Sequence, residues 1–176
     1  MKAVEAEGVA GRTLLDIGGG VGAISHELLR SGLAHATSID AAGAYVAAAR
    51  SEAERQGHAD RLMLQQGDFV LLADDIPAVD IVTLDRVICC YPDMPALVGS
   101  SVAHARQVYG LVYPRDTWWT RLGVRMVNLY FRARRHTFRT FVHSPESVDA
   151  LVTAHGFRIR FRQRTSVWQV VVYARP

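Results

Sequence analysis

The chain has 176 residues, of which 49% are apolar and 21% charged, with a formal net charge of +3. These values are typical of one globular domain with a buried core, and they argue against a disordered, collagen-like or coiled-coil protein. No apolar run approaches the roughly 18 residues of a membrane span. The first eleven residues carry Glu5 and Glu7 and do not resemble a signal peptide. We therefore expect a cytoplasmic protein with a single domain over residues 1–176.

The charge is unevenly distributed along the chain. Residues 1–95 hold seven cationic and fourteen acidic side chains, whereas residues 96–176 hold thirteen and three. A basic half can serve solubility alone, or it can attract an anionic substrate or a nucleic acid.

The two cysteines, Cys89 and Cys90, are adjacent. A disulfide between neighbours would be strained, so we expect two free thiols that pack as small apolar side chains. They make a poor zinc site, and no His, Asp or Glu set shows ligand spacing, so no metal site is predicted.

Short apolar runs alternate with helical stretches from residue 13 to residue 113, which predicts an α/β domain with a mainly parallel sheet. The expected strands are 13–17, 36–39, 62–65, 79–84 and 108–113. The expected helices are 21–31, 42–56 and 94–107.

The chain changes character after Pro114. Apolar side chains fall on one face of a helix expected near residues 118–133, and arginines occupy the rest. Ser144, Pro145 and Glu146 are typical of a helix start, and Gly156 ends that helix. Residues 157–162 alternate apolar side chains with arginines and predict an edge strand, while 167–173 read as a strand covered on both faces.

The strongest local motif follows the first strand and reads Asp16-Ile17-Gly18-Gly19-Gly20-Val21-Gly22. Glycines at a strand-to-helix turn allow a close approach of backbone to ligand, and the free N–H groups of the helix start face the same crevice. A nucleotide-like cofactor is therefore expected there.

An NAD-type site competes for this motif. Gly18, Gly20 and Ala23 satisfy the G-x-G-x-x-G/A pattern, and Asp40 lies about 20 residues further on. Against this reading, Asp16 precedes the glycines, Asp68 follows the third strand, and a Tyr-x-x-x-Lys set for hydride transfer is missing.

The run from Leu14 to Gly22 resembles the first motif of class I S-adenosylmethionine-dependent methyltransferases. Asp40, Gly67-Asp68-Phe69 and the run 79–85 match the family's later landmarks in order and spacing. The resemblance implies a Rossmann-like, doubly wound, seven-stranded sheet whose last strand is antiparallel and inserted beside the fifth. A weaker similarity connects the chain to magnesium-protoporphyrin O-methyltransferases.

The resemblance also implies S-adenosylmethionine as cofactor and S-adenosylhomocysteine as product. Asp16 and the glycines would contact the methionine moiety, Asp40 the ribose, and Asp68 the adenine amino group with Phe69 beside the ring. Asp85 and Arg86 would line the reactive end through their backbone. The expected cofactor-binding set is Asp16, Gly18, Gly19, Gly20, Gly22, Asp40, Ala41, Gly67, Asp68, Phe69, Asp85 and Arg86.

The acceptor side is less determined. Amino-methylating relatives carry Asn/Asp-Pro-Pro-Tyr after the fourth strand, whereas residues 85–93 here depart from that motif. We therefore expect O-methylation of a small, partly apolar, anionic acceptor such as a phenol, enol or carboxylate. No catalytic residue is assigned. The weak candidates, each with a structural role as the alternative, are Tyr91, Cys90, His136 and His143.

Residues 113–143 combine aromatic and arginine side chains, and we expect them to form a substrate-facing insertion or cover. The alternatives are a covering helix with a solvated basic face and peripheral contact with an anionic membrane. RNA fits less well, because the aromatics have helical spacing, and no obligate protein partner is implied.

Only 12 residues precede the first strand, whereas the family resemblance implies N-terminal helices that cap the cofactor. A trimmed chain or an open pocket is the expectation. Two rival functions stay open, a non-catalytic binding module for S-adenosylmethionine or a nucleotide, and an NAD-dependent oxidoreductase.

Overall fold

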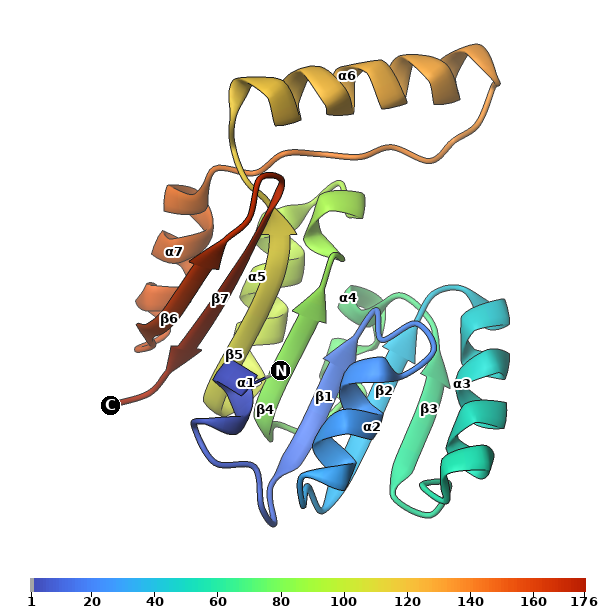
Figure 1. Ribbon diagram of the computed structural model, residues 1–176, viewed down its shortest axis with the longest axis vertical. Helices are drawn as coiled ribbons and strands as arrows, with labels where there is room; N and C mark the ends of the chain where they lie inside the picture. The colour runs from blue at the N-terminus through green and yellow to red at the C-terminus, as the bar shows by residue number, and fades with distance from the viewer. Residues whose placement is uncertain (1) are drawn as a thin grey trace.

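The computed structural model describes residues 2–176 and contains a seven-stranded sheet of order β3-β2-β1-β4-β5-β7-β6 (Figure 1). The strands are β1 (Thr13–Ile17), β2 (His35–Asp40), β3 (Leu62–Gln66), β4 (Val79–Asp85), β5 (Ala105–Pro114), β6 (Arg158–Arg164) and β7 (Trp168–Ala174). Strands β1 to β5 pair in parallel, and β7 is antiparallel to both β5 and β6. The predicted Rossmann-like sheet, with its antiparallel last strand beside the fifth, is confirmed.

Helices cover both faces of this sheet (Figure 1). The helices of the described chain are α1 (Lys2–Glu5), α2 (Ala23–Arg30), α3 (Gly43–Gln56), α4 (Phe69–Leu72), α5 (Met94–Ala103), α6 (Trp118–Ala133) and α7 (Pro145–Ala154), with 3-10 turns at Ala73–Asp75 and Ile88–Cys90. All but α6 pack on the sheet (Figure 1). Within the described part of the chain, no helix is long and apolar enough to cross a bilayer.

The core has two layers because neighbouring residues of a strand point to opposite faces. Leu14 and Ile81 lie in the layer under α1 and α2, whereas Leu15 and Val82 lie in the layer with α4, α5 and α7. Because both faces of the central strands are buried, apolar side chains dominate them, with Asp16 and Thr83 as buried polar exceptions.

Local signals set most helix ends. Gly57 ends α3 in the left-handed conformation at φ 69°. The side chains of Asp93 and Ser144 accept hydrogen bonds from the backbone N–H groups of Ala96 and Ser147, which start α5 and α7. These caps satisfy N–H groups that have no partner inside the helix.

Three of the predicted elements differ from the structure. The predicted helix 94–107 ends at Ala103, and β5 begins at Ala105, because Ala105 pairs with Val79 of β4. Helix α2 begins at Ala23 rather than residue 21, because Gly22 has φ 83°. The predicted edge strand 157–162 is exposed on both faces within β6, where Ile159 is 44% and Phe161 38% exposed, whereas Phe157 just before it is buried.

Helix α6 extends beyond the end of the sheet, and the chain returns beneath it through residues 134–144 (Figure 1). Thr120 is its one buried residue within the described chain. The interpretation of α6 as a helix that covers the body with its apolar side is wrong, because those side chains are exposed.

Candidate functional site

Two adjoining cavities open at the carboxyl ends of β1, β2 and β4, with volumes of about 650 and 560 Å³. Open parallel sheets bind their ligands at this edge. Six residues line both cavities, so the two form one continuous cleft: Gly18, Asp40, Tyr45, Asp85, Arg86 and Cys90.

The glycine bend after β1 forms one wall of the cleft. A Cβ at Gly18 would clash with the side chain of Val87, and a Cβ at Gly19 would clash with Ser38 and come within 2.9 Å of Asp16 Oδ2. Gly20 has φ +57° and open space where a Cβ would stand. The bend therefore requires glycine and leaves backbone exposed to a ligand.

Asp16 lies at the floor of the bend and is buried. Its Oδ1 accepts a hydrogen bond from Thr83 Oγ1 at 2.8 Å, and its Oδ2 accepts one from Ser25 Oγ at 3.1 Å. Burial raises the pKa of Asp16 to about 6, although those two hydrogen bonds act in the opposite direction. The carboxylate therefore ties β1 to β4 and α2 below the cleft.

Asp40 connects the bend to the second strand. Its Oδ2 accepts a hydrogen bond from the N–H of Gly20 at 3.0 Å, and its Oδ1 accepts one from Ala42 at 2.8 Å. Its backbone carbonyl accepts one from Gly67 at 3.0 Å. Each carboxylate oxygen has a second lone pair, so the side chain can still accept from a ligand at the cleft.

Asp68 caps α4 by accepting a hydrogen bond from Val70 N–H at 3.0 Å, and the Tyr91 hydroxyl donates to its carboxylate at 3.0 Å. Burial, with the Asp68 carboxylate as the second cause, raises the pKa of Tyr91 to about 12. Phe69 lies beside Asp68 in the wall of the larger cavity. Tyr91 therefore serves as a hydrogen-bond donor that orients Asp68.

At the open end of the cleft, Arg86 has the unusual φ of 59°, and its N–H donates to Val112 O at 2.8 Å. Its guanidinium pairs with Asp85 at 3.2 Å and lies 6.0 Å from the ring centre of Trp168. This strained conformation holds a cation next to an aromatic face where the smaller cavity opens.

The two cysteines differ in environment. Cys89 is buried, whereas Cys90 is exposed and lines both cavities, with its Sγ 3.7 Å from that of Cys89. The hydrogen bond from the Cys89 thiol lowers the pKa of Cys90 to about 7. The prediction of free thiols is confirmed, but the interpretation of both as packed apolar side chains is wrong for Cys90.

The structure brings most of the predicted cofactor residues together. The residues of that set that line the cleft are Asp16, Gly18, Gly19, Gly20, Asp40, Ala41, Gly67, Asp68, Phe69, Asp85 and Arg86. Gly22 lies outside it, at the start of α2. Among the four catalytic candidates, Tyr91 and Cys90 line the cleft. His136 accepts from Phe138 N–H, and His143 contacts Ile88 O at 2.8 Å, away from it.

Sequence reasoning missed Tyr45, Thr140 and Trp168, which also line the cleft. Tyr45 lies in the first turn of α3, which follows β2 directly. Its place close after the carboxyl end of a parallel strand could have suggested it as a cleft residue. Trp168 reaches the cleft because it pairs with Pro114 across β5 and β7, a register that no local pattern gives.

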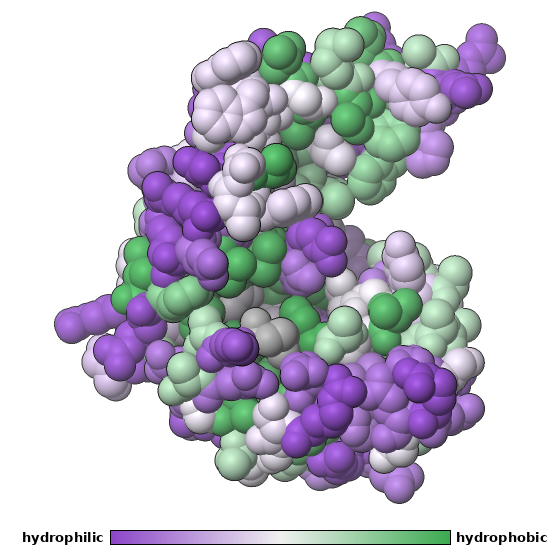
Figure 2. Space-filling model, in the orientation of Figure 1, coloured by the Kyte–Doolittle hydropathy of each residue, from purple (hydrophilic) through white to green (hydrophobic). Residues whose placement is uncertain are grey.

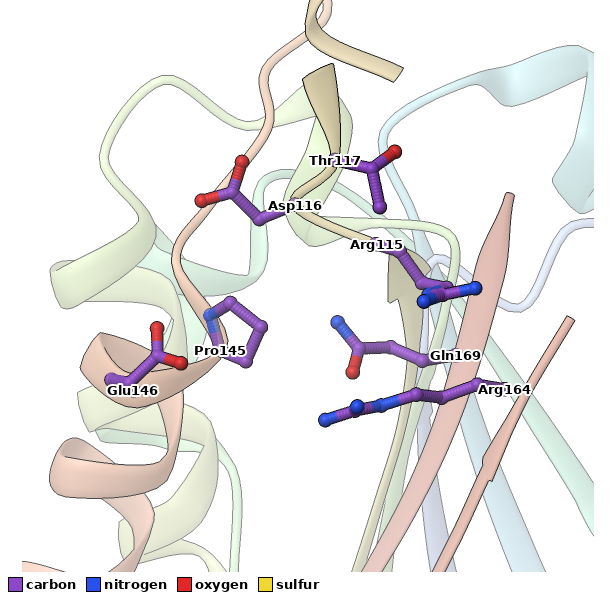
Figure 3. Close-up of a pocket in the computed structure, with 7 residues that line it drawn as sticks. All are labelled: Arg115, Asp116, Thr117, Pro145, Glu146, Arg164 and Gln169. Carbon is purple, nitrogen blue, oxygen red and sulfur yellow. The ribbon is translucent and has the colours of Figure 1, made fainter. Parts of the chain in front are cut away.

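A separate cavity of about 170 Å³ lies where α6 leaves the body, between the start of α7 and the tip of the β6–β7 hairpin (Figure 3). Asp116, at its rim, pairs with Arg121 of α6 at 2.7 Å. Arg115 donates to Thr165 O at 2.9 Å. These contacts anchor the first turn of α6.

Residues 14–107 match the family model described as a methyltransferase domain. This match spans more than half of the chain and contains the glycine bend, Asp40, Asp68 and Asp85. The chain belongs to this family. It is a class I S-adenosylmethionine-dependent methyltransferase, a transferase of one-carbon groups, and the competing NAD reading is set aside.

Solved structures share the fold of this methyltransferase. Magnesium protoporphyrin IX methyltransferase from Synechocystis, with bound S-adenosylhomocysteine, matches with a TM-score of 0.79 and 19% identity over 99% of this chain and 79% of that one. An O-methyltransferase family 2 protein from Planctomyces limnophilus, in complex with apigenin, matches at 0.73 and 19% over 95% and 50%. The [4+2]-cyclase SpnF matches at 0.75 and 14% over 99% and 80%. No curated protein sequence matches the chain.

The cleft of this methyltransferase fits the cofactor. The bend at Gly18 and Gly19 has no room for side chains, so the ligand would meet backbone there. Two carboxylates, Asp40 and Asp68, stand at the ends of β2 and β3 with acceptor capacity left for hydroxyl and amino groups. Phe69 and Leu97 add an apolar wall for a base.

Proposed function

We propose that this methyltransferase transfers the methyl group to an oxygen of a small, partly apolar, anionic acceptor. The observation that carries the proposal is the open end of the cleft, where the Arg86 guanidinium lies beside the Trp168 ring. A flat apolar body fits against the indole, and a carboxylate or phenolate oxygen fits the cation.

In this proposal the larger cavity holds the adenosine. Asp40 would accept from the ribose hydroxyls and Asp68 from the adenine amino group, with Phe69 beside the ring. The glycine bend above Asp16 would hold the methionine moiety, and Asp85 with Arg86 would line the reactive end. Tyr91 positions Asp68 by its hydrogen bond of 3.0 Å.

S-adenosylmethionine supplies an electrophilic methyl carbon on a sulfonium. When bound, it would supply this carbon to an acceptor oxygen, with the carbon–sulfur bond breaking and its electron pair staying on sulfur. With a carboxylate acceptor the charges balance, since an anion and a sulfonium give a neutral ester and a thioether. The chain's contribution is to align the oxygen in line with that bond, which is an effect of positioning.

The environment of the cleft favours a carboxylate over a phenol. A phenol must lose a proton, whereas a carboxylate is already ionised near neutral pH. The Tyr91 hydroxyl is engaged with Asp68, and the His143 ring nitrogen is engaged with Ile88 O. Neither of these two groups is free to take a proton from an acceptor, and the exposed thiol of Cys90 is the candidate base that remains in the cleft.

The return segment supports acceptor binding. Phe138 lines the larger cavity and Thr140 the smaller one. Asn128 of α6 holds this segment, because its Nδ2 donates to Thr140 O at 2.8 Å and its Oδ1 accepts from Thr140 N–H at 2.9 Å. Residues 113–143 would thus shape the acceptor side.

The test is release of S-adenosylhomocysteine with a panel of aromatic and aliphatic carboxylates, phenols and amines. We expect turnover with carboxylates and none with amines. Arg86→Gln should raise KM for the carboxylate at least tenfold and leave the affinity for S-adenosylmethionine within about twofold, since one charge-assisted hydrogen bond is worth more than 1.4 kcal/mol. Turnover with amines alone would overturn the proposal.

Cofactor binding is tested separately by calorimetry on Asp40→Ala. We expect at least a tenfold loss of affinity for S-adenosylmethionine, because two ribose hydroxyls lose an ionic acceptor. The matched control is Asp60→Ala, an exposed carboxylate far from the cleft. Equal affinity in both variants would remove Asp40 from the cofactor site.

A further inference from the structure

The apolar side of α6 is the largest set of exposed apolar side chains on one element. Trp118 is 72% exposed, Met126 and Leu129 are 59% exposed, and Leu122 is 50% exposed. Trp119 and Tyr130 continue the same side, since their spacing of three and four residues puts them on one half of the helix. Green and pale side chains cover most of the visible surface of α6 in Figure 2.

The opposite side of α6 packs against the return segment, residues 134–144. Thr120 is buried, and Val124, Asn128 and Phe131 are half-buried, which are the positions facing the return segment. Asn128 makes two hydrogen bonds to Thr140, and Phe131 meets Phe138 edge to face with ring centres 5.4 Å apart. The return segment therefore fixes which side of α6 points outward.

The charge around this surface has one sign. Residues 117–145 contain six arginines and no aspartate or glutamate. Among residues 2–176, Arg121 pairs with Asp116, but the structure gives Arg125, Arg132 and Arg135 no carboxylate partner. On a helical projection the first two of these border the apolar side rather than oppose it.

We propose that α6 docks this methyltransferase onto an anionic lipid bilayer. The helix lies in the plane of the interface, with Trp118, Leu122 and Met126 among the outer acyl chains and the arginines at the lipid phosphates. Basic amphipathic helices with aromatic side chains on the apolar side bind anionic bilayers in this way, by apolar burial and charge attraction together. Indole and phenol rings favour the headgroup level because one end is apolar and the other polar.

Charge selects a bilayer over a second copy of the chain. Two α6 helices apposed through their apolar sides would bring the bordering arginines of both copies together with no acidic residue in residues 117–145 to separate them. Like charges at such a contact repel, whereas the phosphates of an anionic surface complement them.

Docking would also orient the cleft, a consequence that rests on the proposed function. Phe138 and Thr140 belong to the return segment and line the cleft, so an acceptor dissolved in the bilayer would reach Arg86 from the lipid side. Binding to vesicles is measured without cofactor or acceptor, so its failure is separate from a failure of catalysis.

The experiment is co-sedimentation of the full chain with vesicles of phosphatidylcholine alone or with 30 mol% phosphatidylglycerol, at low and high salt. We expect binding to the anionic vesicles, at least tenfold weaker binding to neutral ones, and release by salt. The emission of Trp118 and Trp119 should shift to shorter wavelength on binding, and Trp118→Phe/Trp119→Phe should remove most of that shift.

Two matched pairs of variants locate the surface. Leu122→Glu/Met126→Glu should weaken binding at least tenfold, whereas Met63→Glu/Leu71→Glu, which alters two exposed apolar residues elsewhere, should change it less than twofold. Arg125→Glu/Arg132→Glu should weaken binding equally, in contrast to Arg106→Glu/Arg158→Glu at the far end of the sheet. Circular dichroism checks that each variant is folded.

Equal loss in the α6 variants and their controls would overturn the proposal, as would binding to neutral and anionic vesicles alike or to neither. Light scattering measures the molar mass in solution and so tests whether two copies of the chain associate through α6. A dimer that Leu122→Glu/Met126→Glu dissociates, in a chain that does not bind vesicles, would assign α6 to self-association instead.

Discussion

Residues at the cofactor cleft are held from below by the sheet, whereas α6 is held along one side and at its first turn. Asp16 and Ser38 are buried under the glycine bend and bond to neighbouring strands and helices. In α6, Thr120 is the one buried residue within the described chain. Apolar side chains thus form the buried core around the cleft, whereas on α6 they form an exposed surface.

The charges follow the same division. The half of the chain that forms most of the cleft is acidic, and its carboxylates accept hydrogen bonds from backbone N–H groups at the ends of strands. The half that contains α6 is basic, and several of its arginines face outward. A ligand held in the cleft meets fixed acceptors, whereas a partner of α6 meets mobile cations on long side chains.

The largest difference should come from truncating one leucine in each region. Leu28 of α2 is fully buried, so Leu28→Ala should lower the free energy of unfolding by about 2–5 kcal/mol through lost burial and the remaining cavity. Leu122 of α6 is half-exposed, and Leu122→Ala should change it by less than about 0.5 kcal/mol. Urea unfolding measures both. A comparable loss in Leu122→Ala would show that α6 packs on the body in solution.

Two glycines give the next contrast. In Gly19→Ala the new Cβ would clash with the Ser38 hydroxyl and approach the Asp16 carboxylate, so we expect a loss of about 1–3 kcal/mol and weaker cofactor binding. Gly123 lies inside α6 with nothing within 4 Å of the Cβ position. Gly123→Ala should stabilise the helix locally by about 1 kcal/mol, which slows amide hydrogen exchange within α6 and leaves the global free energy of unfolding unchanged. Thermal unfolding and calorimetry with S-adenosylmethionine provide the readouts, and a stable Gly19→Ala that binds normally would contradict the tight bend.

The cleft was predictable because its signals are local. The glycine run and Asp16 follow directly on β1, and Asp40, Asp68 and Asp85 each stand at or just after the end of a strand, so placing the strands also places these side chains at one edge of the sheet. Parallel strands bring their carboxyl ends together whatever their order along the chain.

The position of α6 and the contribution of Trp168 were not predictable in this way. Helical periodicity shows which side of α6 is apolar but not whether the body of the protein covers that side. Trp168 depends on the register between β5 and β7, which joins residues far apart in the chain. The start of β5 was missed because the apolar spacing around Val102 and Ala105 suits a helix as well as a strand.

The buried carboxylate of the cleft predicts a pH effect that α6 lacks. Burial raises the pKa of Asp16 to about 6 from its ordinary 3.8, so between these values the folded protein keeps a proton that the unfolded chain has released. The contribution of Asp16 to the free energy of unfolding is therefore fully present below pH 4 and is lost as the pH rises through 6. Asp16→Asn should raise the free energy of unfolding at pH 7 by about 1–3 kcal/mol and leave it unchanged at pH 4.

Urea unfolding at both pH values measures this effect, with Asp60→Asn as the exposed control. If Asp16→Asn instead loses stability at pH 7, the hydrogen bonds from Thr83 and Ser25 outweigh the cost of burying the charge.

The smallest expected difference in stability comes from removing the N-terminal caps of α7 and α6. Ser144 accepts a hydrogen bond from Ser147 N–H at 3.2 Å and starts α7, whose Val148 and Val152 are buried in the core. Thr117 accepts one from Thr120 N–H at 3.4 Å and starts α6. Ser144→Ala should lower the global free energy of unfolding by about 1 kcal/mol. Thr117→Ala should leave it unchanged and instead speed amide hydrogen exchange within α6, because a helix outside the core opens without unfolding the sheet. If Thr117→Ala lowers the global value as much as Ser144→Ala does, α6 belongs to the same cooperative unit as the cleft.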